Sequence, residues 1–185
     1  MGPQPGGLLL EKRRQLLQRL WALQRTIPSF LQWDTPATEG NPPWVRMQRA
    51  RLQSLHECVS MRLHWAIMSL DPVFNASHQR HRETDSYSAF LLASTRVLEI
   101  AKESVVVNNH ARCLFHADAI RATAALLQMI LRKVTQERAD VDKYISSCRD
   151  GIAIGRSLVP KVFARAEGIF ERLLNEYAPS KMLAN

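Results

Sequence analysis

The chain has few of the residues that build small sites without a large core. Its 185 residues include only three cysteines, seven glycines and nine prolines. Cys58, Cys113 and Cys148 are odd in number and far apart, so they predict free thiols rather than a disulfide framework or a zinc-binding pair. The low glycine and proline contents argue against a fibrous or disordered chain. A globular domain with an ordinary apolar core is the remaining class.

Long apolar runs are also missing. No stretch approaches the roughly 18 residues that cross a bilayer, and residues 89–93 form one of the longest candidates. The first residues lack the basic start of a secretory signal. We therefore expect an intracellular protein with no membrane partner.

The positive charge is not gathered into one basic stripe. The net charge is +8, with eight basic against four acidic residues in 1–60, five against five in 61–110 and twelve against eight in 111–185. Nucleic-acid binding usually needs a clustered basic surface. We therefore expect no specific DNA binding by this chain alone.

Apolar residues recur at three- and four-residue steps through most of the chain. This period predicts an all-α fold, a bundle or array of about six helices. The predicted helices cover residues 8–25, 44–70, 111–132, 139–149 and 160–177, with another that begins near Asp85 and frays at 105–107. Residues 1–7 are predicted to be a flexible N-terminus, 8–177 a single helical domain and 178–185 a tail.

The same spacing predicts which faces are buried. Residues 44–70 carry two apolar faces and are predicted to form the central helix, with a more polar first half. The first predicted face holds Leu52, Leu55, Val59, Leu63, Ile67 and Leu70, and the second holds Cys58, Met61, Trp65 and Met68. The exposed first half is expected to hold Arg46, Arg49, Arg51, Gln53 and Glu57. The predicted stripes of two other helices are Leu9, Leu10, Leu16, Leu17, Leu20 and Trp21, and Tyr87, Leu91, Leu92, Thr95, Leu98 and Val105. Gly151 and Gly155 are expected to form a turn or a close packing point.

Catalytic motifs are missing from the sequence. There is no glycine-rich phosphate loop, no HExxH and no GxSxG element, so we expect no enzymatic activity. His78 and His81 could both reach a metal, but nothing nearby completes four ligands, and a solvated loop is the simpler interpretation. We expect no cofactor in this chain.

Two groups of residues remain as candidate binding sites. The first is a set in apolar surroundings that could line an effector pocket or simply pack in the core: His64, Trp65, Met68, Phe90 and His116. The second is the set of aromatics around one turn, Trp21, Phe30 and Trp33, which could be a core corner or an exposed anchor for a partner.

The order of several motifs carries a family resemblance. A helix with Trp21 is followed by the turn Ile27-Pro28-Ser29-Phe30-Leu31, a long helix that stops at Asp71-Pro72-Val73-Phe74, and an alanine-rich helix near residues 88–94. These features resemble the C-terminal half of the middle homology region of fungal binuclear zinc-cluster transcription factors. The resemblance extends from about residue 8 to 133.

That resemblance implies an all-helical regulatory domain of a nuclear protein. Its implied partners are a small-molecule effector and proteins of the transcription machinery, or a second copy through self-association. Zinc belongs to the family's cysteine-rich DNA-binding module, which the three cysteines here cannot form, so we expect a regulatory fragment. The alternative is a stand-alone helical interaction module that forms a homodimer or docks a partner.

Overall fold

The computed structural model describes residues 5–34, 40–70, 85–107, 112–131, 138–158 and 160–177. These residues form six α-helices and one short 3-10 helix, and none of them is in a strand. The predicted all-α class is confirmed. None of the described helices is both long and apolar enough to span a membrane.

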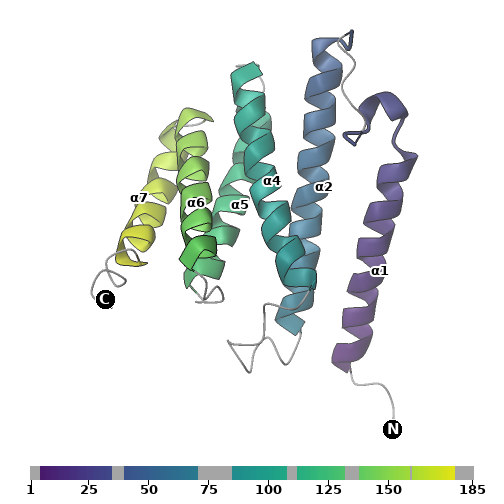
Figure 1. Ribbon diagram of the computed structural model, residues 1–185, viewed down its shortest axis with the longest axis horizontal. Helices are drawn as coiled ribbons and strands as arrows, with labels where there is room; N and C mark the ends of the chain where they lie inside the picture. The colour runs from purple at the N-terminus through teal and green to yellow at the C-terminus, as the bar shows by residue number, and fades with distance from the viewer. Residues whose placement is uncertain are drawn as a thin grey trace. The chain divides into compact units, whose positions relative to one another are not determined.

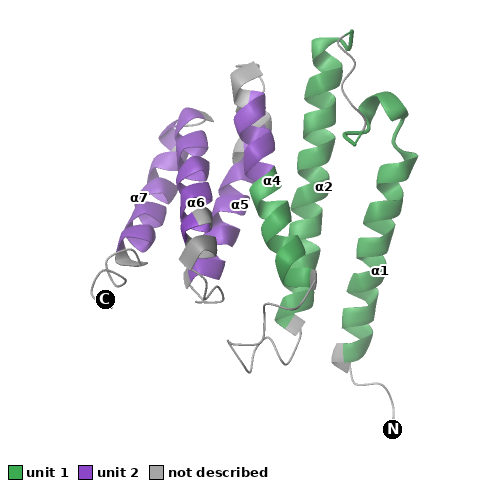
Figure 2. Cartoon of the chain, in the orientation of Figure 1, with its two compact units in different colours: residues 1–96 green, residues 97–185 purple. Residues whose placement is uncertain are grey.

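The chain divides into two compact units (Figure 2). Unit 1, residues 1–96, holds α1 (Pro5–Thr26), the 3-10 helix η1 (Ser29–Leu31), α2 (Pro43–Leu70) and the first part of α4 (Asp85–Val107). Unit 2, residues 97–185, holds the rest of α4, α5 (Arg112–Leu131), α6 (Arg138–Leu158) and α7 (Pro160–Tyr177). Two contact units in one helical array are not by themselves two domains, so the single domain over 8–177 stays a prediction.

Within unit 1, α1 and α2 lie side by side and run in opposite directions (Figure 1). Within unit 2, α6 packs against both α5 and α7. Prolines open α1, α2 and α7 at Pro5, Pro43 and Pro160. Proline suits the first turn of a helix because its missing N–H would have no partner there. The predicted start at Pro160 is confirmed.

Two predicted boundaries are wrong. The first helix begins at Pro5, so residues 5–7 are helical rather than part of a flexible N-terminus. The fifth helix does not stop near Arg149, because α6 continues through Gly151 and Gly155 to Leu158. The predicted N-terminal residues 1–4, the connector near His78 and His81 and the tail 178–185 lie outside the described residues.

The core of unit 1 lies between the second apolar face of α2 and α4. Met61, Met68, Phe90 and Leu91 are all buried there, together with Cys58. The core of unit 2 is lined by large apolar side chains from three helices, including Phe115, Leu126, Ile130, Ile152, Phe163 and Leu174. Cys58 and Cys148 are buried thiols outside any disulfide, as predicted. The side chain of Cys113 lies outside the described residues.

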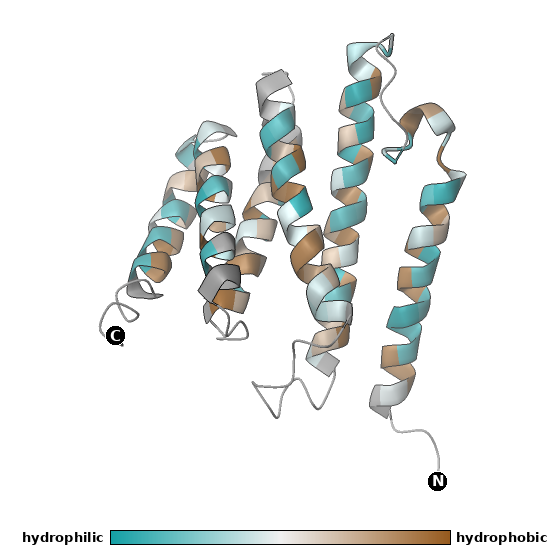
Figure 3. Cartoon of the chain, in the orientation of Figure 1, coloured by the Kyte–Doolittle hydropathy of each residue, from teal (hydrophilic) through white to brown (hydrophobic). Residues whose placement is uncertain are grey.

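Several predicted core positions are on the surface instead. Leu55 and Val59 of α2 are exposed, and so are Leu92 of α4 and three residues of the predicted α1 stripe, Leu9, Leu16 and Trp21. In contrast, Arg49 and Glu57, predicted to be exposed, are buried. Helical spacing finds apolar stripes correctly but does not tell which stripe another helix covers. Figure 3 shows hydrophobic residues that alternate with hydrophilic ones along α1.

Candidate interaction site

The end of α1 presents three side chains on one side of the helix. Trp21, Gln24 and Arg25 are spaced by three and four residues, which places them next to each other on a helical surface. The helix ends at Thr26, whose hydroxyl donates a hydrogen bond to the carbonyl of Leu23 at 2.8 Å. Arg25 lies in the last turn, where a cation is favoured by the negative end of the helix dipole.

A tight turn then brings the chain back toward these residues. The N–H of Leu31 donates to the carbonyl of Pro28 at 2.8 Å, which closes η1. The side-chain amide of Gln32 donates to the carbonyl of Ile27 at 2.8 Å. The amide of Gln24 donates to the carboxylate of Asp34. These bonds fix the turn against the end of α1.

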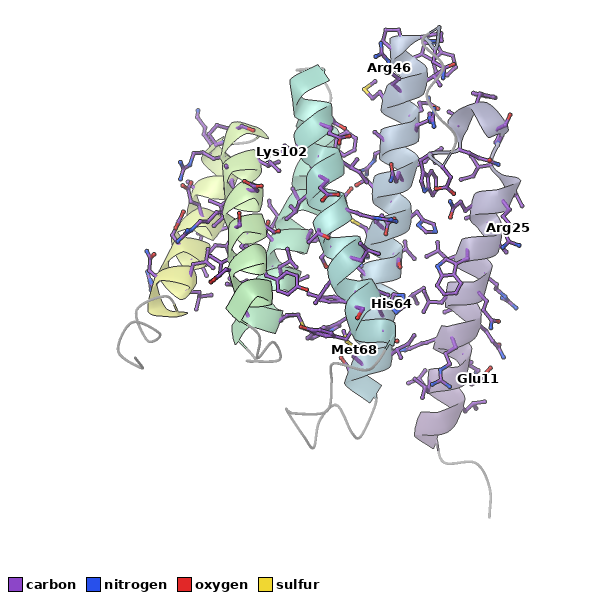
Figure 4. All side chains as sticks on the ribbon, viewed as in Figure 1. Glu11, Arg25, Arg46, His64, Met68 and Lys102 are labelled. Atoms are coloured by element: carbon purple, nitrogen blue, oxygen red, sulfur yellow. The ribbon has the colours of Figure 1, made fainter. Side chains whose placement is uncertain are left out.

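The result is a cavity of about 410 Å³ lined by residues from the helix end and the turn: Trp21, Gln24, Arg25, Gln32 and Asp34. Trp21 is 51% exposed, so its indole is available to a ligand. Figure 4 labels Arg25, which forms no ion pair with any described residue. The wall therefore combines an aromatic surface, a guanidinium, two amides and a carboxylate.

The three aromatics predicted as partner contacts have different surroundings. Trp21 and Phe30 are each about half exposed. Trp33 is less exposed, and its ring lies against the His56 ring of α2, with centroids 5.3 Å apart at 54°. Trp33 thus contributes to holding the turn on α2, while Trp21 and Phe30 stay open to solvent.

Asp34 also acts on two titratable residues of α2. Burial lowers the pKa of His56, and the nearby Asp34 carboxylate partly opposes this. Burial raises the pKa of Glu57, and the Arg96 guanidinium, with Nη1 3.5 Å from Oε1, partly opposes this shift. The Asp34 carboxylate adds a smaller effect that raises the same pKa. The edge of the cavity is therefore electrostatically coupled to a charged cluster inside unit 1.

The residues predicted to line an effector pocket do not all come together. His64 and Met68 are buried on α2 (Figure 4), and the Trp65 and Phe90 rings lie 5.6 Å apart. These four residues belong to unit 1, and three of them are buried while Trp65 is half-buried. His116 belongs to unit 2, and its side chain lies outside the described residues. An effector site at these positions stays a prediction.

Four cavity residues were missed by the sequence reasoning: Gln24, Arg25, Gln32 and Asp34. The available signal was the position of Gln24 and Arg25 three and four residues after Trp21. The contribution of Gln32 and Asp34 depends on how the turn folds back, which residue spacing does not encode.

Comparisons with known proteins add no relative. No protein-family model, no curated protein and no solved structure matches this chain. Among the described residues, no group of three or more histidine, cysteine or acidic side chains lies close enough to hold a metal ion.

Proposed function

We propose that this chain is a helical regulatory module that binds a segment of a partner protein at the cavity between α1 and the following turn. The observation that carries the proposal is the cavity itself, with a half-exposed Trp21 beside the exposed Arg25, which forms no ion pair with a described residue. Tryptophan and arginine are the residues that most often dominate the energy of a protein interface.

The chemistry of the cavity favours a peptide with an apolar and an acidic side chain. Its volume, about 410 Å³, is in the usual range of ligand sites. The indole of Trp21 offers apolar contact, and the Arg25 guanidinium offers a bidentate partner for a carboxylate. Asp34 accepts a hydrogen bond from Gln24, which holds the carboxylate at the wall of the cavity. We propose a binding module and not an enzyme.

The resemblance to zinc-cluster regulators supplies the setting for such a module. In that setting the chain is the regulatory part of a nuclear transcription factor, and its partner is a protein of the transcription machinery. The proposal is supported by the order of the sequence motifs. Reading the coding sequence upstream of Met1 tests it, because an in-frame zinc-cluster module is expected there.

The binding site is tested by peptide selection on the whole chain. A library of random 12-residue peptides, about the length that spans one such cavity and its edge, is selected on the wild-type protein. We expect enriched peptides with an acidic residue near a large apolar one. Replacing Trp21 with alanine, or Arg25 with glutamate, should weaken the binding of these peptides by about tenfold or more in fluorescence anisotropy.

A matched control uses a second exposed tryptophan of the same unit. Trp44 is 53% exposed and does not line the cavity, so Trp44→Ala should leave peptide affinity unchanged. If the selected peptides bind the Trp21→Ala and Trp44→Ala variants equally well, the cavity is not the binding site and the proposal is wrong.

A further inference from the structure

A second surface of α1 carries a narrow row of exposed leucines. Leu9, Leu16 and Leu23 follow one another at seven-residue steps and are 42%, 48% and 58% exposed. Seven residues are almost two helical turns, so the three side chains lie in one line along the helix. We call this line the leucine row.

The leucine row is separate from the face of α1 that packs on α2. Leu17 is only 5% exposed and marks the packed face, and Leu10 and Leu20 are half-buried. Consecutive residues of a helix are about 100° apart, so Leu16 points well away from the direction of Leu17. By the same geometry Trp21, five residues after Leu16, lies about 140° around the helix from the leucine row, beyond the packed face.

Positive charge follows the leucine row along its length. Lys12 and Arg19 come three residues after Leu9 and Leu16, which places them beside these leucines on the helix surface. Both are exposed, and neither forms an ion pair with any described residue. Glu11 is the only acidic residue of α1 and lies on the opposite side from the leucine row.

We propose that the leucine row is the docking site of an acidic amphipathic helix of a partner protein. An apolar row at helical spacing is complementary to the apolar stripe of another helix. Lys12 and Arg19 select acidic residues on the flank of that helix. Docking of a second copy of α1 would place Lys12 and Arg19 of the two copies close together, and their repulsion disfavours this occupant. A membrane surface would need a broad, continuous apolar face. The other exposed large apolar residues of α1 do not widen the row into one, because Leu8 lies about 100° around the helix from Leu9 and Trp21 about 140° from Leu16.

The test uses two designed helical peptides of about 20 residues, close to the length of α1. Both carry leucine at seven-residue spacing with apolar neighbours, and they differ only in glutamate or lysine on the flanks. With the full chain, the glutamate peptide should bind about tenfold or more tightly than the lysine peptide, and added salt should reduce the difference.

Charge reversal on the protein provides the decisive comparison. The double variant Lys12→Glu and Arg19→Glu should prefer the lysine peptide, while Arg14→Glu, an exposed cation elsewhere on α1, should keep the wild-type preference. Leu16→Asp should lose both peptides. Leu16 is exposed, so this variant should keep the wild-type circular dichroism spectrum.

Several results would overturn the proposal. Equal binding of the two peptides, or no binding, would remove the acidic helix as occupant. A dimer in sedimentation experiments that dissociates in Leu16→Asp would make a second copy the occupant. Binding to phosphatidylserine vesicles that is lost in Leu16→Asp, without peptide binding, would make the row a membrane contact. Because Trp21→Ala leaves the leucine row intact, peptide binding there is independent of the cavity between α1 and the turn.

Discussion

Burial shifts the pKa values of two side chains of α2, and the two shifts make the stability of the protein depend on pH in opposite directions. Burial lowers the pKa of His64, and its Nδ1 has no hydrogen-bond partner among the described residues. Burial raises the pKa of Glu57, against a smaller effect of Arg96. A histidine that is buried in its neutral form destabilises the folded protein as the pH falls. A carboxyl group that is buried in its protonated form destabilises it as the pH rises.

His64→Leu should remove the histidine contribution. The unfolded chain takes up a proton at His64 near its ordinary pKa, about 6.5, before the folded chain does. Wild-type stability therefore falls as the pH decreases from about 7.5 through 6.5 toward the lower folded pKa. We expect the variant to gain stability relative to wild type over this range, as measured by urea unfolding at each pH. A constant difference between the two proteins would contradict a lowered pKa at His64.

Glu57→Gln provides a check of opposite sign. The folded pKa of Glu57 is raised, so its contribution is fully present below the unfolded pKa, about 4.3, and is lost as the pH rises through the folded pKa. Arg96 interacts with the ionised carboxylate, so its effect is already contained in the folded pKa of Glu57. Relative to wild type, the variant should therefore become more stable as the pH increases from about 4.5, and a trend in the other direction would show that Arg96 dominates.

At the scale of helices, close packing explains why two glycines lie inside α6. A Cβ at Gly151 would lie 2.0 Å from Oγ1 of Thr123, and a Cβ at Gly155 would lie 2.4 Å from the Phe163 ring. Thr123 and Phe163 are fully buried, so neither side chain can move aside easily. The alternative of a close packing point, predicted from the sequence, is correct, and the alternative of a turn is wrong.

Gly155→Ala and Gly168→Ala should change stability in opposite directions. Alanine favours a helix over glycine by about 1 kcal/mol, and Gly168 of α7 has open space around it. Gly168→Ala should therefore stabilise the protein by up to about 1 kcal/mol. At Gly155 the clash with Phe163 outweighs this gain, and we expect a loss of about 1–3 kcal/mol in urea unfolding. Equal effects of the two substitutions would contradict the close packing.

The sequence predicted helix positions well because helical spacing and proline starts are local properties. It was less successful with burial on α2. Leu55 and Val59 follow the same spacing as a buried face but are exposed, while Glu57 is buried next to Arg96. A pattern in one helix contains no information on which neighbour packs on which side, and a buried charge depends on a partner 39 residues away.

At the scale of the whole molecule, the boundary between the two units falls inside α4. Its first part contributes Tyr87, Phe90 and Leu91 to the core of unit 1, and its second part contributes Val97 and Leu98 to unit 2. A helix forms cooperatively along its length, so loss of one half weakens the other. We therefore expect the two units to unfold together.

The distribution of tryptophans makes cooperative unfolding measurable. All four, Trp21, Trp33, Trp44 and Trp65, belong to unit 1, so their fluorescence reports on that unit alone. Far-ultraviolet circular dichroism reports on the helices of both units. In urea the two signals should give the same midpoint. Separate midpoints would mean that the units unfold independently.

The candidate site was only partly predictable for a related reason. Trp21 and Phe30 were identified from the aromatics around Pro28, which is a local signal. The cavity also needs Gln32 and Asp34, which the hydrogen bonds of the turn bring back to α1. Leu9 and Leu16 of the leucine row were predicted as part of a core stripe, and they are exposed because α2 covers only the side of α1 that carries Leu17.

The contact between Gly151 and Thr123 also restricts how the sequence can change over evolution. The Thr123 hydroxyl donates to the Ala119 carbonyl at 2.8 Å, which fixes the side chain in the position that a Cβ at residue 151 would occupy. A descendant with alanine at 151 is therefore expected to carry glycine at 123, or to have acquired it first. The two positions should vary as a pair among the descendants of this gene, although they are 28 residues apart on different helices.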